Sequence, residues 1–270
     1  MARILITGSS TGLGLMAGQL LIAQGHTVVL HGKDGARSDA AMAAAPGAAD
    51  VVTGDLASQR QTHDLAAQAN RLGRFDAVIH NAGIGYREPA RIETEDGLPH
   101  VFAVNTMAPY LLTALIERPS RLIYLSSGLH RGAGTGLDDL PWRKRRWQGL
   151  PAYAESKLHD VLLAFAMARQ WPDVLSNALE PGWVATRMGG AGAPDDLAKA
   201  HLTQAWLAAS DEPLARSTGR YFFHQVMREA DPAARDVSLQ DALLDACQRF
   251  SGIAIPRGPI ATSPVGWSRA

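Results

Sequence analysis

Two residues that could exchange a proton with a substrate stand four positions apart, Tyr153 and Lys157 in the stretch YAESK. On a helix this spacing places both side chains on one face. A phenol with a pKa of about 10 is a poor base at neutral pH, but a neighbouring ammonium group stabilises the phenolate. The pair could therefore donate a proton to a carbonyl oxygen or accept one from an alcohol. The alternative is that Tyr153 is an aromatic residue that only caps a helix.

The stretch ILITGSSTGLG, residues 4–14, could bind a phosphate. Its glycines, Gly8, Gly12 and Gly14, have the spacing G-x-x-x-G-x-G, which differs from the dinucleotide pattern G-x-G-x-x-G. After an apolar strand, such a turn leads into a helix whose N-terminal N–H groups and partial positive charge favour a pyrophosphate. Glycine permits the positive φ angles and the close backbone approach that this requires. A strand-to-helix turn without any ligand stays the alternative.

The elements that must position these groups alternate along the chain. Short apolar runs, typical of strands covered on both faces, are separated by longer helical patterns. We predict strands at residues 3–7, 27–31, 50–53, 77–80, 121–125, 175–179 and 220–223, and helices at residues 13–24, 58–72, 101–116, 154–170 and 195–209. This order predicts an α/β fold with one doubly wound parallel sheet of about seven strands and helices on both faces. We expect a single Rossmann-fold domain over residues 1–270.

Two segments fall outside this alternation. Residues 128–151 form a long interval between a strand and a helix, and loops of that length inside a domain are more often functional than accidental. Within it, WRKRRW (142–147) places four cations between two tryptophans, and we expect a solvated basic patch rather than a clamp for an anionic substrate. Residues 256–270, rich in Pro, Gly and Ser, are expected to form a surface tail.

Composition argues against several classes of protein. The 26 basic and 26 acidic residues give a formal net charge of zero, which does not favour nucleic acid or an anionic membrane as a partner. Cys247 is the single cysteine, which rules out an internal disulfide and suits a reducing compartment. The sequence has no run of about 18 apolar residues, and its nine histidines lack a metal-binding spacing such as H-E-x-x-H. We expect a cytoplasmic protein without a membrane span, a nucleic-acid partner or a metal.

Further motifs follow in order. They are GDL (54–56), NAG (81–83), Asn105, LSS (125–127), YAESK (153–157) and PGWVAT (181–186). Together with residues 7–14, which fit T-G-x-x-x-G-x-G, they resemble the short-chain dehydrogenase/reductase family over nearly the whole chain. SSGLHRG, AYAESKL and GRYFF are most similar to its retinol-dehydrogenase-like branch. The resemblance implies an oxidoreductase that moves a hydride between a nicotinamide cofactor and a small carbonyl or secondary alcohol substrate.

The resemblance implies four catalytic residues. Tyr153 would be the general acid or base, and Lys157 would also bind the ribose hydroxyls next to the nicotinamide. Asn105 would hold a water that links Lys157 to solvent. Of the two adjacent serines, the family pattern selects Ser127 rather than Ser126 to hydrogen-bond and polarise the substrate oxygen. A non-catalytic nucleotide sensor on the same fold would not need these residues together, and extended epimerases and dehydratases usually have a longer C-terminal substrate domain.

The resemblance also implies the cofactor contacts. Asp55 and Leu56 would meet the adenine ring, residues 81–83 would line the adenosine ribose, and residues 181–186 would bind the nicotinamide carboxamide. The full predicted set is Gly8, Ser10, Thr11, Gly12, Leu13, Gly14, Lys33, Asp55, Leu56, Asn81, Ala82, Gly83, Tyr153, Lys157, Pro181, Gly182, Val184 and Thr186. His80 stands where relatives commonly have asparagine, a departure of unknown effect.

The choice between NADP and NAD depends on the end of the second strand, VVLHGKD. NAD enzymes usually place an acidic residue there to accept from the ribose 2′-OH, and by alignment that position is Gly32. Lys33 follows, with Arg37 nearby, and a cation can pair with a 2′-phosphate. Asp34 is one residue too late for this contact and is expected to be solvated, while Thr11 stands where many NADP-dependent relatives carry a basic residue. We predict NADP, with NAD less favoured.

Two further expectations concern the substrate pocket and the assembly. Trp183 and Met188 follow the nicotinamide segment and are pocket candidates, and residues 188–196 have the glycine content of a mobile lid. The helix MAPYLLTALIERP (107–119) is shorter than that of relatives, in which it contributes to the four-helix bundle of a dimer. We therefore expect a monomer or a differently built homodimer.

Overall fold

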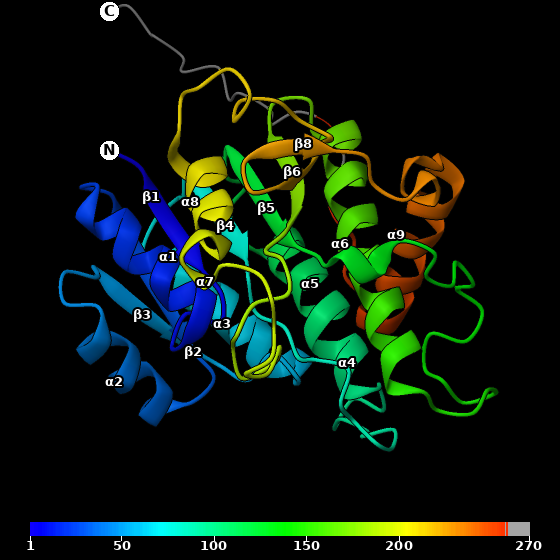
Figure 1. The fold of residues 1–270 in the computed structure, drawn as a ribbon. Helices are drawn as coiled ribbons and strands as arrows, with labels where there is room; N and C mark the ends of the chain where they lie inside the picture. The colour runs from blue at the N-terminus through cyan, green and yellow to red at the C-terminus, as the bar shows by residue number, and fades with distance from the viewer. Residues whose placement is uncertain (257, 259–270) are drawn as a thin grey trace, which may run out of the picture.

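The computed structural model describes residues 1–256 and 258 and is built around one eight-stranded sheet (Figure 1). The strands lie in the order β3-β2-β1-β4-β5-β6-β7-β8, and all neighbours are parallel except β7 and β8. They are β1 (Arg3–Ile6), β2 (Thr27–Gly32), β3 (Asp50–Thr53), β4 (Ala77–His80), β5 (Arg121–Leu125), β6 (Leu175–Glu180), β7 (Tyr221–Phe223) and β8 (Val226–Arg228). The seven predicted strands are confirmed. β8 escapes prediction because its three residues are all exposed and form no apolar run.

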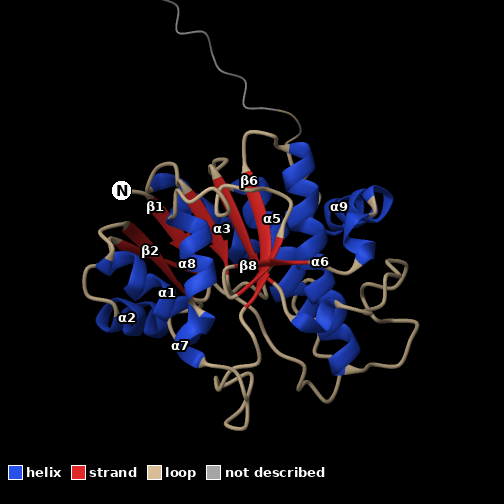
Figure 2. Ribbon diagram, turned by 45° about the horizontal axis from the view of Figure 1, so that its top comes forward, coloured by secondary structure: helices blue, strands red, loops and turns tan. Residues whose placement is uncertain are grey.

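Helices cover both faces of the sheet (Figure 2). One face carries α1 (Gly12–Ala23), α2 (Gly35–Ala44) and α8 (Leu202–Ala209); the other carries α3 (Gln59–Arg71), α5 (Ala108–Leu115) and α6 (Gly149–Gln170), with α9 (Val237–Ser251) packed on α6. Shorter helices are α4 (His100–Phe102) and α7 (Leu197–Ala200). Within β1, Ile4 and Ile6 face the first layer and Leu5 faces the second, because side chains alternate along a strand. The predicted doubly wound α/β architecture is therefore confirmed.

Three helices differ from the sequence prediction. α2, composed mostly of small residues, and α9 are not predicted, and α6 begins at Gly149 rather than at residue 154. Because of that earlier start, Tyr153 lies inside α6 and shares it with Lys157. Among the described residues, no helix is long and apolar enough to cross a membrane. The predicted surface tail lies outside the described residues, apart from residues 256 and 258.

The long interval between β5 and α6 has a fixed internal structure. Asp139 accepts hydrogen bonds from three backbone N–H groups of the segment 143–145. Arg145 donates to both carboxylate oxygens of Glu155 at 2.6 Å, and its guanidinium carbon lies 3.6 Å from the ring centre of Trp142. The other three cations of WRKRRW are exposed. The expectation of a solvated patch thus holds for those three, whereas Arg145 is a structural residue that ties the loop to α6.

Candidate active site

The glycine-rich turn joins β1 to α1 at the carboxyl edge of the sheet. Gly8 and Gly12 have φ angles of 63° and 61°, which side-chain-bearing residues rarely adopt. A Cβ on Gly8 would lie 2.7 Å from the Cα of Ala82, and a Cβ on Gly14 would lie 2.4 Å from Nδ2 of Asn81. The turn therefore packs directly against the segment that follows β4, and glycine is needed for that contact.

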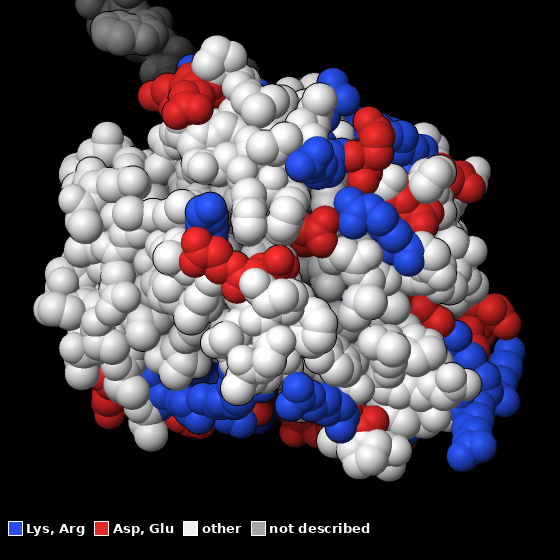
Figure 3. All heavy atoms as spheres, in the orientation of Figure 1, with Lys and Arg blue, Asp and Glu red and all other residues white. Residues whose placement is uncertain are grey.

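The first turn of α1 is open to an anion. Within the described part of the chain, the side chain of its N-cap residue, Thr11, makes no capping hydrogen bond. By contrast, the N-cap side chains Asp34 of α2, Ser58 of α3 and Asp236 of α9 each accept at least one from a backbone N–H. The first turn of α1 has no acidic residue, and the left part of the surface in Figure 3, where α1 lies, carries few charged side chains. Unpaired N–H groups at such a helix start bind phosphate, so the turn fits a dinucleotide cofactor.

A buried histidine that the motifs do not reveal fastens this turn. His31 on β2 accepts a hydrogen bond at Nδ1 from the Gly8 N–H (2.8 Å). Its Nε2 therefore carries the proton and donates to the Gly54 carbonyl oxygen, also at 2.8 Å. Burial lowers the pKa of His31, so the ring is neutral at pH 7. A polar residue within the apolar run VVLHG is the sequence signal for this contact.

The segments expected at the adenosine lie beside the turn. Asn81 donates from Nδ2 to the Thr7 carbonyl oxygen (2.9 Å), and the Ala82 N–H donates to the Thr7 hydroxyl (3.0 Å). Asp55 follows β3, and one of its carboxylate oxygens accepts a backbone N–H two residues further on (3.0 Å), while Leu56 is buried. Both segments thus stand at the carboxyl edge of the sheet that also carries the glycine-rich turn.

The end of β2 leaves no room for a side chain at Gly32. A Cβ there would lie 2.4 Å from the backbone nitrogen of Ser38 in α2. Lys33, the next residue, is exposed, and Arg37 is half-buried. Asp34 is exposed as expected, and it also caps α2 by accepting from the Arg37 N–H at 2.8 Å. The first charged side chain after this strand is therefore a cation.

Asn105 lies in a π-helical turn, Ala103–Met107, between α4 and α5. Such turns are frequent at functional sites, and this one interrupts the helix predicted over residues 101–116. Asn105 is fully buried: its Oδ1 accepts from the Ile84 N–H (2.8 Å), and its Nδ2 donates to the Ile84 carbonyl oxygen and to Ser156 Oγ, both at 3.0 Å. The side chain thereby fixes the loop after β4 against α6. Its role in holding a water stays a prediction.

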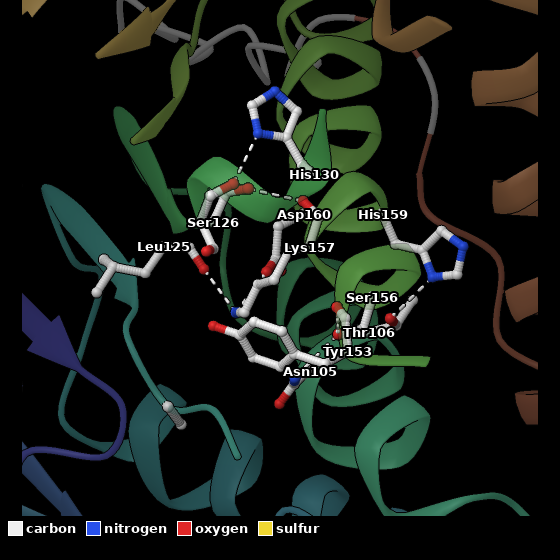
Figure 4. Close-up of polar contacts among 12 residues, drawn as sticks. Asn105, Thr106, Leu125, Ser126, His130, Tyr153, Ser156, Lys157, His159 and Asp160 are labelled. Atoms are coloured by element: carbon white, nitrogen blue, oxygen red, sulfur yellow. Dashed lines mark hydrogen bonds and ion pairs between the residues drawn. The ribbon is translucent and has the colours of Figure 1, made fainter. Parts of the chain in front are cut away.

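Three of the predicted catalytic residues converge in space (Figure 4). Asn105 Oδ1 and Lys157 Nζ both lie 3.5 Å from the position that a Cβ on Gly83 would occupy. Tyr153 precedes Lys157 by about one turn of α6, and its ring centre lies 5.7 Å from Lys157 Nζ. Glycine at position 83 therefore keeps the space between the amide and the ammonium group open.

The Lys157 ammonium group is buried and held on two sides. Nζ donates to the Leu125 carbonyl oxygen and to the Asp160 carboxylate, both at 2.8 Å. Burial alone would lower the pKa of Lys157, but the charge of Asp160, its hydrogen bond and the nearby Tyr153 together outweigh burial, so the pKa is raised and the lysine is protonated at pH 7. Burial raises the pKa of Asp160 to about 6. Asp160 is not among the predicted residues; its spacing of three from Lys157 on one helix is the signal that could have found it.

Tyr153 lies against the segment that follows β6. Its ring packs edge-on against Tyr86, with centres 5.7 Å apart, and its hydroxyl is 3.8 Å from the sulfur of Met188. The Met188 side chain also reaches Gly85, where a Cβ would lie 2.8 Å from its Cγ. Trp183, the other pocket candidate, is 56% exposed. Of the two, Met188 is the residue that covers the phenol.

The predicted nicotinamide segment and the glycine-rich lid segment fold on one another. Gly182 has a φ of 89°, and a Cβ there would lie 2.8 Å from a carboxylate oxygen of Asp195, which accepts from the Trp183 N–H at 2.6 Å. Buried Val184 pairs with Asp195 in an isolated bridge. The Thr186 hydroxyl accepts a backbone N–H of the lid segment at 3.2 Å. These contacts place residues 181–186 at the end of β6, on the same edge as the glycine-rich turn.

The two adjacent serines differ in environment. Ser126 is buried, and its hydroxyl donates to the Lys157 carbonyl oxygen at 2.7 Å. Ser127 is half-buried, and its oxygen accepts from the Leu129 N–H at 3.3 Å, which leaves its hydroxyl hydrogen for another acceptor. His130, neutral because burial lowers its pKa, donates from Nδ1 to the Ser127 carbonyl oxygen (2.7 Å) and accepts at Nε2 from the Asp231 N–H (3.0 Å). Ser127 is thus held by its backbone, and its side chain is accessible.

His80, which stands where relatives commonly have asparagine, is a core residue. Its ring lies 4.7 Å from that of Tyr124, and its Nε2 lies 3.2 Å from the Thr113 hydroxyl. Complete burial lowers the pKa of His80 to about 3, so it is neutral. Throughout the described ranges, no group of three His, Cys, Asp or Glu side chains could hold a metal ion.

Comparisons with known proteins show which family the chain resembles in sequence and in fold. A family model described as short chain dehydrogenase matches residues 2–121. The short-chain dehydrogenase chyC of Penicillium rubens is 41% identical, and the match covers 95% of this chain and 100% of that protein. Retinol dehydrogenase 13 of Homo sapiens is 34% identical, and the match covers 69% of this chain and 60% of that protein. The crystal structure of a blue fluorescent protein from a metagenomic library, in complex with NADPH, has a TM-score of 0.65 at 22% identity and covers 82% of this chain and 95% of that one. The chain therefore belongs to the short-chain dehydrogenase/reductase family of oxidoreductases.

Proposed function

We propose that this oxidoreductase transfers a hydride between NADP(H) and a small carbonyl compound or secondary alcohol, with Tyr153 as general acid and base. The observation that carries the proposal is the meeting of Lys157 and Asn105 at Gly83, with Tyr153 one turn away on α6. A protonated lysine beside a phenol stabilises the phenolate. A nucleotide sensor requires none of these groups.

In the direction of reduction, each residue has a distinct task. A nicotinamide cofactor, held by the glycine-rich turn and residues 181–186, would supply the hydride. The Ser127 hydroxyl donates a hydrogen bond to the substrate oxygen, where negative charge develops. Tyr153 donates its proton to that oxygen, and the Lys157 ammonium stabilises the phenolate that remains. The Met188 sulfur, 3.8 Å from the hydroxyl, borders the place where a substrate oxygen would meet the phenol.

The proposal is tested with a panel of aldehydes, ketones and secondary alcohols, in which the absorbance of NADPH is followed. We expect turnover of at least one carbonyl compound and its reversal with the corresponding alcohol and NADP. If NADPH binds but no member of a broad panel is turned over, the enzymatic proposal fails and a sensor becomes the better explanation.

The preference for NADPH over NADH should depend on Lys33. Gly32 has no room for a carboxylate, and the exposed Lys33 can pair with a 2′-phosphate. We expect Lys33→Ala to raise the KM for NADPH about tenfold, the worth of one charge-assisted hydrogen bond, and to leave the KM for NADH unchanged. Lys199→Ala, which removes an exposed lysine of α7, is the matched control. Equal or better use of NADH by the wild-type enzyme would contradict the assignment.

We further propose that the protein is a monomer in the cytoplasm, where its buried, free Cys247 suits a reducing environment. The chain itself covers the outer side of the helices that many relatives use in a dimer. α9 packs along α6, the Tyr110 hydroxyl of α5 donates to the Ile253 carbonyl oxygen (2.6 Å), and the rings of Phe102 and Phe250 lie 5.8 Å apart. Light scattering should give the mass of one chain, 28.8 kDa; a mass of two or of four chains would contradict the monomer.

A further inference from the structure

A buried carboxylate stands directly behind the proton-transfer pair. The side chain of Asp160 is 3% exposed and that of Lys157 is 5% exposed, and their charged atoms lie 2.8 Å apart (Figure 4). An ammonium group has three N–H donors. One is directed to Asp160 and one to the Leu125 carbonyl oxygen, so a single donor remains for the phenol and the ribose.

We propose that Asp160 is a positioning residue that fixes the Lys157 ammonium group and offsets its charge at the phenol, so that the enzyme is set for carbonyl reduction. This inference rests on the proposed function, in which Tyr153 is the proton donor. It adds a preferred direction of reaction and assigns that preference to one side chain.

The physical reason is the sum of charges at the site. A lone buried ammonium group strongly favours loss of the neighbouring phenolic proton, whereas a carboxylate in contact with the ammonium cancels much of that effect. Because the groups interact strongly, the proton lost at high pH belongs to the cluster of Tyr153, Lys157 and Asp160 rather than to one residue. Removing the carboxylate raises the charge of the cluster by one, so this proton leaves at lower pH.

The other titratable groups around the cluster do not change this balance of charge. They are Tyr124 on β5, Tyr221 on β7, Glu180 at the end of β6 and Arg131, which follows the turn Gly128–His130. Burial raises the pKa of Tyr124 and of Tyr221 far above the usual value, so both phenols are neutral. Glu180 and Arg131 carry opposite charges and form an ion pair at 3.0 Å. Among the described residues, Asp160 is thus the carboxylate whose charge acts on Lys157.

The test compares Asp160→Asn with three other variants. Asparagine keeps the size of the side chain and an oxygen that can accept from Nζ, but removes the charge. Glu155→Gln is the matched control, because it also removes a buried carboxylate of α6, one that pairs with Arg145 and not with Lys157. Asp160→Glu keeps the charge on a longer side chain. Asp160→Ala, which also lacks the charge, repeats the measurement if Asp160→Asn does not fold.

The first readout is the pH profile of kcat/KM for carbonyl reduction at saturating NADPH. The alkaline limb, where the proton of the cluster is lost, should move to lower pH by about one unit or more in Asp160→Asn. The ratio of alcohol oxidation to carbonyl reduction at pH 7 should rise at the same time. Glu155→Gln and Asp160→Glu should keep the limb of the wild-type enzyme. An unmoved limb in Asp160→Asn, or an equal shift in Glu155→Gln, overturns the proposal.

The second readout needs neither substrate nor cofactor. Tyrosinate absorbance is titrated with and without Tyr153→Phe, in the wild-type and the Asp160→Asn backgrounds, and each difference isolates the signal of residue 153. This signal should appear at lower pH in Asp160→Asn. If it does while no carbonyl compound is turned over, the role of Asp160 stands and the proposed function fails. If turnover is found but neither the limb nor the absorbance midpoint moves, the proposed function stands and the role of Asp160 fails.

Discussion

Replacing Tyr153 with phenylalanine should lower kcat for carbonyl reduction about a thousandfold, in the range expected for loss of a general acid. The substitution keeps the buried ring and its edge-on contact with Tyr86 and removes only the hydroxyl. That hydroxyl lies next to the Met188 sulfur, a weak partner, so its loss should cost the fold little. The variant is therefore expected to fold normally and still to bind NADPH, with an affinity within about tenfold of the wild type because one predicted cofactor contact is lost. Steady-state kinetics and a fluorescence titration of NADPH binding measure the two effects separately.

Tyr110→Phe is the matched control for this experiment. It removes the hydroxyl of another buried tyrosine, which donates to the Ile253 carbonyl oxygen at 2.6 Å and has no contact with Tyr153 or Lys157. We expect it to lose about 1 kcal/mol of stability and to keep its activity. If Tyr153→Phe retained more than about a tenth of the wild-type kcat, the activation barrier would have risen by less than about 1.4 kcal/mol. Tyr153 would then not be the proton donor.

The fold can be predicted from the sequence where burial leaves a periodic signal. β1, β2, β4 and β5 are covered on both faces, so each is a continuous apolar run in the sequence. β8 has no such signal, because it is paired on one edge only and all its residues are exposed. α2 is equally hard to predict, since its alanines and glycine form no distinct apolar stripe.

The site can be predicted where function requires a residue type at a fixed spacing. Tyr153 and Lys157 share a helix, and Gly8 and Gly12 need backbone angles that glycine alone adopts readily, so short motifs reveal them. Contacts between segments distant in sequence leave no such motif. His31 meets Gly8 only because β2 lies beside β1, and Met188 reaches Tyr153 only because the segment after β6 folds back across the site.

The two serines at the end of β5 should separate a catalytic effect from a structural one. Ser127→Ala should lower kcat for carbonyl reduction about a hundredfold, the usual cost of losing one donor to a developing oxyanion. Its stability should fall little, because the hydrogen bond lost, from the Leu129 N–H, is long at 3.3 Å and partly exposed. Ser126→Ala should lose about 1 kcal/mol of stability, because it removes a buried hydrogen bond to the Lys157 carbonyl oxygen.

Kinetics and thermal unfolding of both variants distinguish the two roles. The Ser126 hydroxyl already has an acceptor on the backbone of α6 and would have to break that bond to reach a substrate. Its replacement should therefore leave kcat within a few-fold of the wild-type value, and Ser127→Thr, which keeps a hydroxyl at the accessible position, should retain more activity than Ser127→Ala. The opposite outcome, a large loss of kcat in Ser126→Ala with Ser127→Ala nearly active, would move the polarising hydroxyl to Ser126. It would also mean that the end of β5 rearranges when substrate binds, because in this structure the hydroxyl of Ser127 is the accessible one.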